Sequence, residues 1–253
     1  MDRKTYIRDI YSKYWLTARE KKYGFSAYDI NLCNLLLNFT NHIPCNKVKL
    51  LEAAIGTGYP FADFFQRKGY SVHGVDISPD LIKKCHTIYP RINAVVGDAE
   101  LLNYPDDIFD ITYCFHSTWY FPNLGKAICE MVRVTRPGGY ILFDIQNRSN
   151  QSIERIYKKR LSEMEGIGRL RRYAENIVKV ILQRGFPDWH FVVHETPTYP
   201  QDVYKYLNGC KYSNTFTVYI RNENDTLESK KEISSLERYG RLVFVVSKAA
   251  SRK

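Results

Sequence analysis

Short apolar runs and amphipathic segments alternate along residues 48–146 of this chain. The apolar runs predict buried strands, and the apolar positions at helical spacing between them predict helices that pack on a sheet. Such alternation is typical of a parallel sheet with crossover helices. The predicted strands are 48–54, 71–75, 92–96, 109–115 and 140–145, and the predicted helices are 60–68, one starting at Pro79, and about 124–135.

Two regions lie outside this alternation. Residues 5–40 show aromatic and leucine side chains at helical spacing, so we expect residues 1–45 to form a helical cover. Residues 148–185 trace two amphipathic helices with Gly166 and Gly168 between them, which predicts a helical insertion or lid over 148–188. Strand-like sequence then returns at 191–193, 215–220 and 241–246, the last two suiting an antiparallel pair. No repeat is visible, and we interpret residues 1–253 as a single domain.

Composition excludes several classes of protein. The hydrophobic fraction is 44%, and no stretch approaches the roughly 20 apolar residues that span a bilayer. The N-terminus is charged and has no apolar run behind it, so a cytoplasmic location is the default expectation. The net charge is +10, and residues 151–253 alone carry 19 Lys or Arg against 12 Asp or Glu. Such an excess fits either a solvated basic surface or an anionic partner.

The six cysteines are scattered and include no Cys-x-x-Cys pair. This spacing argues against a zinc site and against a disulfide framework, so we expect reduced and mostly buried thiols. His190 and His194 share a face of one predicted strand, but no carboxylate at ligand spacing accompanies them. We therefore expect no metal.

The segment Leu50–Gly58 contains the strongest candidate for a binding site. It reads as a buried strand that runs into a glycine turn, and Pro60 then opens a helix. Glycines there let the backbone approach a ligand at a helix N-terminus, where unpaired N–H groups accumulate. A nucleotide-like cofactor is the obvious candidate.

Three features narrow the choice of cofactor. Asp76 ends the next strand, where a carboxylate can accept hydrogen bonds from ribose hydroxyls. Phe61 occupies the position at which a dinucleotide fingerprint needs a small residue. The Lys-Ser/Thr of a phosphate-binding P-loop is missing. The turn is therefore suited to a nucleoside without phosphates.

An ordered set of motifs spans about residues 48–146 and resembles the class I S-adenosylmethionine-dependent methyltransferases of small-molecule type. The motifs are Glu52-Ala-Ala-Ile-Gly-Thr-Gly58, Gly74-Val-Asp-Ile-Ser78, Gly97-Asp-Ala-Glu100, Phe109-Asp110 and Arg133-Val-Thr-Arg-Pro-Gly-Gly139. The resemblance implies an α/β Rossmann-like sheet of seven strands, with the last strand antiparallel.

The resemblance also implies S-adenosylmethionine as cofactor and assigns its contacts. Asp76 would hold the ribose, and Asp98 would face the adenine amino group. Ala54 departs from the glycine usual at its position, and the start Ile10-Tyr-Ser-Lys-Tyr14 is similar to a segment whose tyrosine covers the cofactor. The complete set of expected cofactor contacts is Tyr14, Glu52, Ala54, Gly56, Gly58, Asp76, Ile77, Asp98, Ala99 and Phe115.

His116 follows the fourth predicted strand, where acceptor and cofactor meet in similar proteins. It is either a general base for an oxygen, nitrogen or carbon nucleophile or a hydrogen-bonded structural histidine. Because the sulfonium cofactor is already reactive, the protein's main task is to align nucleophile, methyl group and sulfur.

The sequence leaves three alternatives for the function of the bound cofactor. Methyl transfer to a small molecule is the first expectation. Methylation of RNA through the basic residues 155–172 is the second, although Cys-Phe-His-Ser stands where a base-flipping Asn-Pro-Pro-Tyr motif would follow the fourth strand. A non-catalytic module that binds S-adenosylmethionine is the third. Oligomeric state and the role of the basic helices are not predicted.

Overall fold

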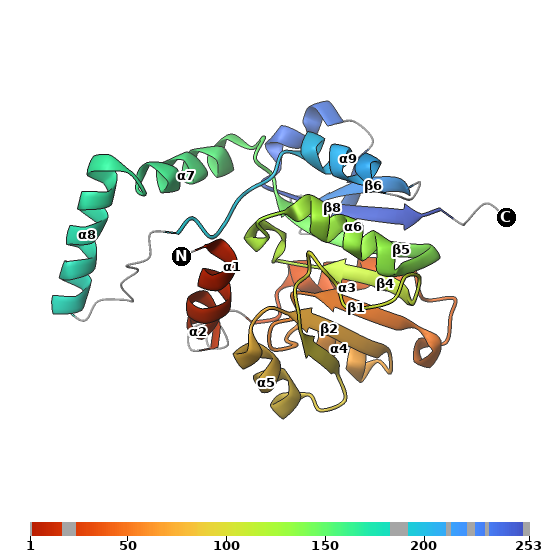
Figure 1. Ribbon diagram of the computed structural model, residues 1–253. Coiled ribbons are helices and arrows are strands. Elements are labelled where there is room, and N and C mark those ends of the chain that lie inside the picture. The colour runs from red at the N-terminus through yellow and green to blue at the C-terminus, as the bar shows by residue number, and fades with distance from the viewer. Residues whose placement is uncertain are drawn as a thin grey trace.

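A computed structural model describes residues 2–16, 24–182, 192–210, 214–221, 226–230 and 233–249. Its centre is an eight-stranded sheet of order β3-β2-β1-β4-β5-β8-β6-β7 (Figure 1). The five strands of the predicted alternation, β1 to β5, are parallel, whereas β8 is antiparallel to β5 and to β6. The strands are β1 (Lys49–Ala53), β2 (Ser71–Asp76), β3 (Asn93–Val96), β4 (Phe109–Cys114), β5 (Thr135–Gln146), β6 (Asn214–Arg221), β7 (Leu227–Lys230) and β8 (Arg241–Lys248).

The Rossmann-like fold expected from the sequence is confirmed, with eight strands in place of seven. The additional strand is β7, which pairs with the outer edge of β6. Its four residues show no apolar alternation, since only Leu227 is hydrophobic, and pairing rather than pattern makes them a strand. Residues 192 and 193 are not in a strand, and Phe191 lies outside the described residues.

Helices cover both faces of the sheet. One face packs against α3 (Ala27–Leu37), α4 (Phe61–Arg67) and α5 (Pro79–Ile88) around buried residues such as Leu36 and Phe65. The other face packs against α6 (Leu124–Val134) and α9 (Pro200–Gly209) around Met131 and Phe244. Pro60 immediately precedes α4 as its N-cap residue and does not open it as expected. Short helical turns lie at Cys45–Lys47, Thr118–Tyr120 and Ile233–Arg238.

The N-terminal segment is helical at α1 (Arg3–Tyr6), at a π-helical turn (Ile7–Tyr11) and at α2 (Ser12–Tyr14). It lies beside the carboxyl ends of the strands because Arg3 donates hydrogen bonds to the carbonyl oxygens of Trp119 and His194. The cover predicted for residues 1–45 thus contacts the sheet domain through its first turn. Residues 17–23 lie outside the described part of the chain.

The insertion contains α7 (Gln151–Ser162) and α8 (Gly166–Ile181), which extend away from the sheet at the left of Figure 1. The apolar stripe of α8 faces outward: Ile167 is 85% exposed and Ile181 71%. Asn176 is instead the buried residue of this helix. None of the described helices is both long and apolar enough to cross a bilayer.

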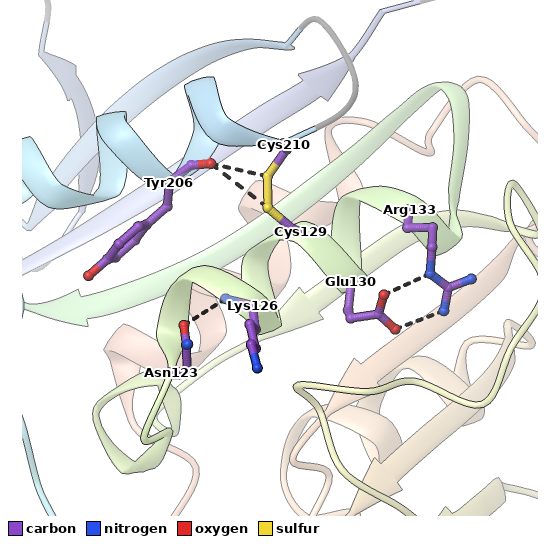
Figure 2. Close-up of a disulfide and its surroundings, with 7 residues drawn as sticks. All are labelled: Asn123, Lys126, Cys129, Glu130, Arg133, Tyr206 and Cys210. Atoms are coloured by element: carbon purple, nitrogen blue, oxygen red, sulfur yellow. Dashed lines mark hydrogen bonds and ion pairs between the residues drawn. A yellow bond between two sulfur atoms is a disulfide. The ribbon is translucent and has the colours of Figure 1, made fainter.

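Cys129 of α6 and Cys210 after α9 form a disulfide, with their Cα atoms 5.2 Å apart (Figure 2). This corrects the expectation of reduced thiols for these two residues. A separation of 81 residues gives no motif, so only the packing of α6 against α9 brings the pair together. The other four cysteines are free, and three of them are buried.

Candidate active site

The glycine turn after β1 departs from ordinary backbone geometry at three alternate positions. Ala54, Gly56 and Gly58 have φ angles of 62°, 57° and 86°, in the left-handed region that favours glycine. A Cβ on Gly56 would meet nothing within 4 Å, so this residue leaves open space for a ligand. A Cβ on Gly58 would lie 3.0 Å from the Tyr89 ring and 3.1 Å from Cys85 Sγ. Gly58 therefore packs against the end of α5 and does not line the cavity described below.

Asp76 ends β2 directly beside this turn. Its Oδ2 accepts a hydrogen bond from the Gly56 N–H at 2.9 Å, and its Oδ1 accepts one from the Ser78 N–H at 2.9 Å. Burial raises the pKa of Asp76 to about 6, and the two backbone hydrogen bonds offset part of that rise. The carboxyl group is thus held in one orientation at the base of the turn, with a further lone pair on each oxygen.

Glu52 lies one strand away and is also buried. The Tyr113 hydroxyl donates to its Oε2 at 3.0 Å. Burial raises the pKa of Glu52 well above its usual value. Its carboxyl group lies at the wall of the cavity described below.

Asp98 follows β3 and contacts the N-terminal segment. Lys4 Nζ lies 2.5 Å from Asp98 Oδ2 and 2.7 Å from Glu100 Oε2, and the Glu100 N–H donates to Asp98 Oδ1 at 2.9 Å. The N-terminal helix therefore closes over the end of the sheet at which the sequence predicts the adenine.

One cavity of about 910 Å³ joins these groups at the carboxyl ends of β1, β2, β3 and β4. Ligands of open α/β sheets bind at this edge, where the connections diverge to opposite faces. The side chain of Tyr14 lies outside the described part of the chain, and Gly58 faces away. His116 lines the cavity. So do all the other residues expected to contact the cofactor, which are Glu52, Ala54, Gly56, Asp76, Ile77, Asp98, Ala99 and Phe115.

His116 has a φ of 59°, the second non-glycine residue of the cavity in the left-handed region. Asp144 of β5, which is fully buried, accepts the His116 backbone N–H at 2.7 Å. This bond fixes the strained turn and directs the imidazole ring toward α3. Backbone strain of this kind costs about 1–3 kcal/mol and is concentrated at functional sites.

Both ring nitrogens of His116 have partners. Nε2 lies 2.6 Å from Asp29 Oδ1, and Nδ1 contacts the guanidinium of Arg241. Since an arginine only donates, His116 Nδ1 accepts the hydrogen bond from Arg241, and the Nε2–H group donates one to Asp29 Oδ1. Arg241 is also 3.2 Å from Asp144 Oδ2. Burial raises the pKa of Asp29, but hydrogen bonds from His116 and Ser26 outweigh it and leave that pKa below its usual value.

Asp29, Asp144 and Arg241 were not predicted as site residues from the sequence. Of the three, only Asp29 belongs to a local sequence pattern. Ser26-x-x-Asp29 is a capping box at the start of α3, and both of its hydrogen bonds are present. Asp144 and Arg241 lie inside runs that read as ordinary strand sequence. Their place beside His116 depends on the pairing of Gln146 with Arg241 between β5 and β8.

Comparison with known proteins agrees with this geometry. Residues 51–143 match the family described as "Methyltransferase domain". The chain is 30% identical over 125 residues to phthiotriol/phenolphthiotriol dimycocerosates methyltransferase 1 of Mycobacterium ulcerans, covering 48% of this chain and 46% of that protein. It is 34% identical over 95 residues to malonyl-[acyl-carrier protein] O-methyltransferase of Serratia marcescens, covering 38% and 37%. The matched segments thus span less than half the length of these relatives.

Among solved structures, magnesium protoporphyrin IX methyltransferase of Synechocystis PCC 6803, with bound S-adenosylhomocysteine (SAH), has a TM-score of 0.59. It is 12% identical and covers 98% of each chain, a likeness of fold alone. The family match over residues 51–143 and the Rossmann-like fold agree with the resemblance to the class I S-adenosylmethionine-dependent methyltransferases, whose cofactor is S-adenosylmethionine. The open space at Gly56 and the fixed carboxyl of Asp76 suit a nucleoside.

Proposed function

We propose that the protein transfers the methyl group of S-adenosylmethionine to a small-molecule acceptor bound beside His116. The observation that carries this proposal is that the expected cofactor residues and the Asp29–His116–Arg241 cluster line one cavity. The cofactor supplies a methyl group on a positively charged sulfur. This chain supplies the alignment, a cavity and a base.

His116 has the arrangement that a general base requires. Asp29 accepts a hydrogen bond from the His116 Nε2–H group. It would stabilise the imidazolium that forms when Nδ1 takes the acceptor's proton. Arg241 occupies Nδ1 in this structure, so the acceptor must displace its guanidinium before the proton can move. The acceptor atom is oxygen, nitrogen or carbon. The relatives' names, with phthiotriol dimycocerosates and malonyl-[acyl-carrier protein] among them, favour a small or lipid-borne acceptor over a nucleic acid.

Methylation of RNA has less support from the basic helices. Within the described part of residues 155–172, Arg160 pairs with Glu195 and Arg172 pairs with Glu163. Exposed neighbours such as Lys158 also have a carboxylate within 4 Å. These pairs reduce the positive charge available to phosphates.

The test is release of SAH from S-adenosylmethionine in three parallel reactions: with a metabolite and lipid extract, with total RNA, and with buffer alone. We expect release with the extract only. Release with RNA that falls steeply with salt would make RNA the acceptor. Binding of SAH without release in any reaction would favour a non-catalytic module.

His116→Ala tests the assignment of the base. We expect turnover to fall at least about a hundredfold, the usual contribution of general base catalysis, while SAH affinity stays within about threefold. His42→Ala is the matched control, since His42 is exposed and lies outside the cavity. If His116→Ala turns over like the control, His116 has only a structural role.

A further inference from the structure

The charged side chains of the cavity separate into two ends. The cofactor end carries Asp76, Asp98 and Glu100 against Lys4. An acidic end suits S-adenosylmethionine, which carries a sulfonium and an ammonium against one carboxylate. The opposite end carries the arginines Arg221, Arg238 and Arg241.

Strand pairing places two of these arginines next to each other. Arg241 begins β8 opposite Gln146, the last residue of β5. Ile220 of β6 pairs with Leu242 of β8, so Arg221, the last residue of β6, lies beside Arg241 at the same edge. This edge of the sheet is the one that carries His116.

Tyr28 of α3 lies beneath both guanidinium groups. The Arg221 guanidinium carbon is 5.5 Å from the centre of its ring, and that of Arg241 is 6.0 Å away. Tyr28 is 6% exposed and lines the cavity, yet its buried hydroxyl has no hydrogen-bond partner among the described residues. A buried hydroxyl without a partner costs free energy unless a ligand supplies one.

The carboxylates of Asp29 and Asp144 lie beside this end of the cavity. Asp29 is engaged by His116 and Ser26, and Asp144 by Arg241 and the His116 backbone. Cation–π contacts with Tyr28 and, for Arg241, with Trp119 at 4.6 Å fix the guanidinium positions before a ligand arrives.

We propose that the methyl acceptor carries an anionic group, a carboxylate or a phosphate, which binds between Arg221 and Arg241 and accepts the Tyr28 hydroxyl proton as a hydrogen bond. This inference rests on the proposed function. Binding of the anion draws the Arg241 guanidinium away from His116 Nδ1 and exposes the lone pair of the base. The acceptor's proton then moves to Nδ1 as its nucleophile forms a bond to the methyl carbon, and the bond from that carbon to sulfur breaks, with the electron pair staying on the sulfur of SAH. Recognition of the anion and activation of the base are therefore one event.

Calorimetry on protein saturated with SAH tests this proposal without a known acceptor. The probes are benzoate, phenyl phosphate and the uncharged benzamide, at constant ionic strength because exposed charges are screened by salt. We expect one anion to bind at least tenfold more tightly than benzamide, and the preferred anion distinguishes carboxylate from phosphate. Arg221→Gln and Arg241→Gln should each reduce that preference at least fivefold, with SAH affinity unchanged within twofold.

Arg155→Gln is the matched control, since Arg155 is an exposed arginine of α7 that does not line the cavity. Arg221 is exposed at a strand end, so its variant should fold even if that of Arg241 does not. Equal binding of benzamide and the anions, or an unchanged preference in Arg221→Gln, would overturn the proposal. Weakened SAH binding in the arginine variants would also overturn it, because the arginines would then hold the cofactor. Failure of the unaltered protein to bind SAH would refute the proposed function itself.

Discussion

Protonation of Asp76 should weaken cofactor binding as the pH falls. Burial raises the pKa of this carboxyl group to about 6. The ribose hydroxyls of the cofactor donate hydrogen bonds, so the ionised carboxylate is the form that accepts both of them. Binding therefore selects the ionised form, and acid opposes it.

The magnitude follows from the ionised fraction. With a pKa of about 6, that fraction falls from about 0.97 at pH 7.5 to about 0.09 at pH 5.0, so the Kd for SAH should rise about tenfold. The effect on the stability of the cofactor-free protein has the opposite sign. Because the folded pKa lies above the unfolded value of 3.8, the contribution of Asp76 is fully present below pH 3.8 and is lost as the pH rises through about 6.

The assay is calorimetric titration with SAH at pH 7.5, 6.5, 5.8 and 5.0 and constant ionic strength, with circular dichroism at each pH to verify the fold. Asp76→Asn is the control. It should bind SAH at least about tenfold more weakly at pH 7.5, since a charge-assisted hydrogen bond contributes roughly 1.5–3 kcal/mol. It should also lose the pH dependence. A Kd that stays within twofold from pH 7.5 to 5.0 in folded, unaltered protein would refute the reasoning.

Two further predictions concern stability. Ala54→Gly should raise the free energy of unfolding by about 1 kcal/mol, because Ala54 has a φ of 62°, whereas Ala53→Gly in ordinary strand backbone should lower it; urea denaturation of both variants checks the sign. Replacing Cys129 and Cys210 together by Ala should lower the free energy of unfolding by up to about 4 kcal/mol, because the disulfide closes a loop across 81 residues. A urea midpoint that does not change on treatment with a reductant would contradict the second expectation.

Local sequence signals are sufficient to predict that the glycine turn after β1 and Asp76 lie together. β1, its glycine turn and the acid that ends β2 are adjacent in the chain or separated by one helix, so strand pattern and turn chemistry predict where Gly56 and Asp76 meet. Ala54 departs from the glycine usual in the motif, and its positive φ angle in the structure gives the reason why glycine is usual there.

The surroundings of His116 depend on contacts between distant segments. His116 meets Asp29 across 87 positions and Arg241 across 125, and neither distance leaves a pattern in the sequence. The outward apolar stripe of α8 shows the same limit, because periodicity gives a helix an apolar face without determining what that face contacts.

The sequence by itself thus predicted the parallel sheet and a nucleoside site at the glycine turn, and its motifs carried the resemblance to the class I methyltransferases. The sheet and the turn follow from short-range backbone and side-chain chemistry. Only the tertiary structure decided which groups surround His116, that α6 and α9 are joined by a disulfide, and that β7 adds an eighth strand. Strand pairing and helix packing bring those residues together, and the free energy of such contacts is absent from any local segment.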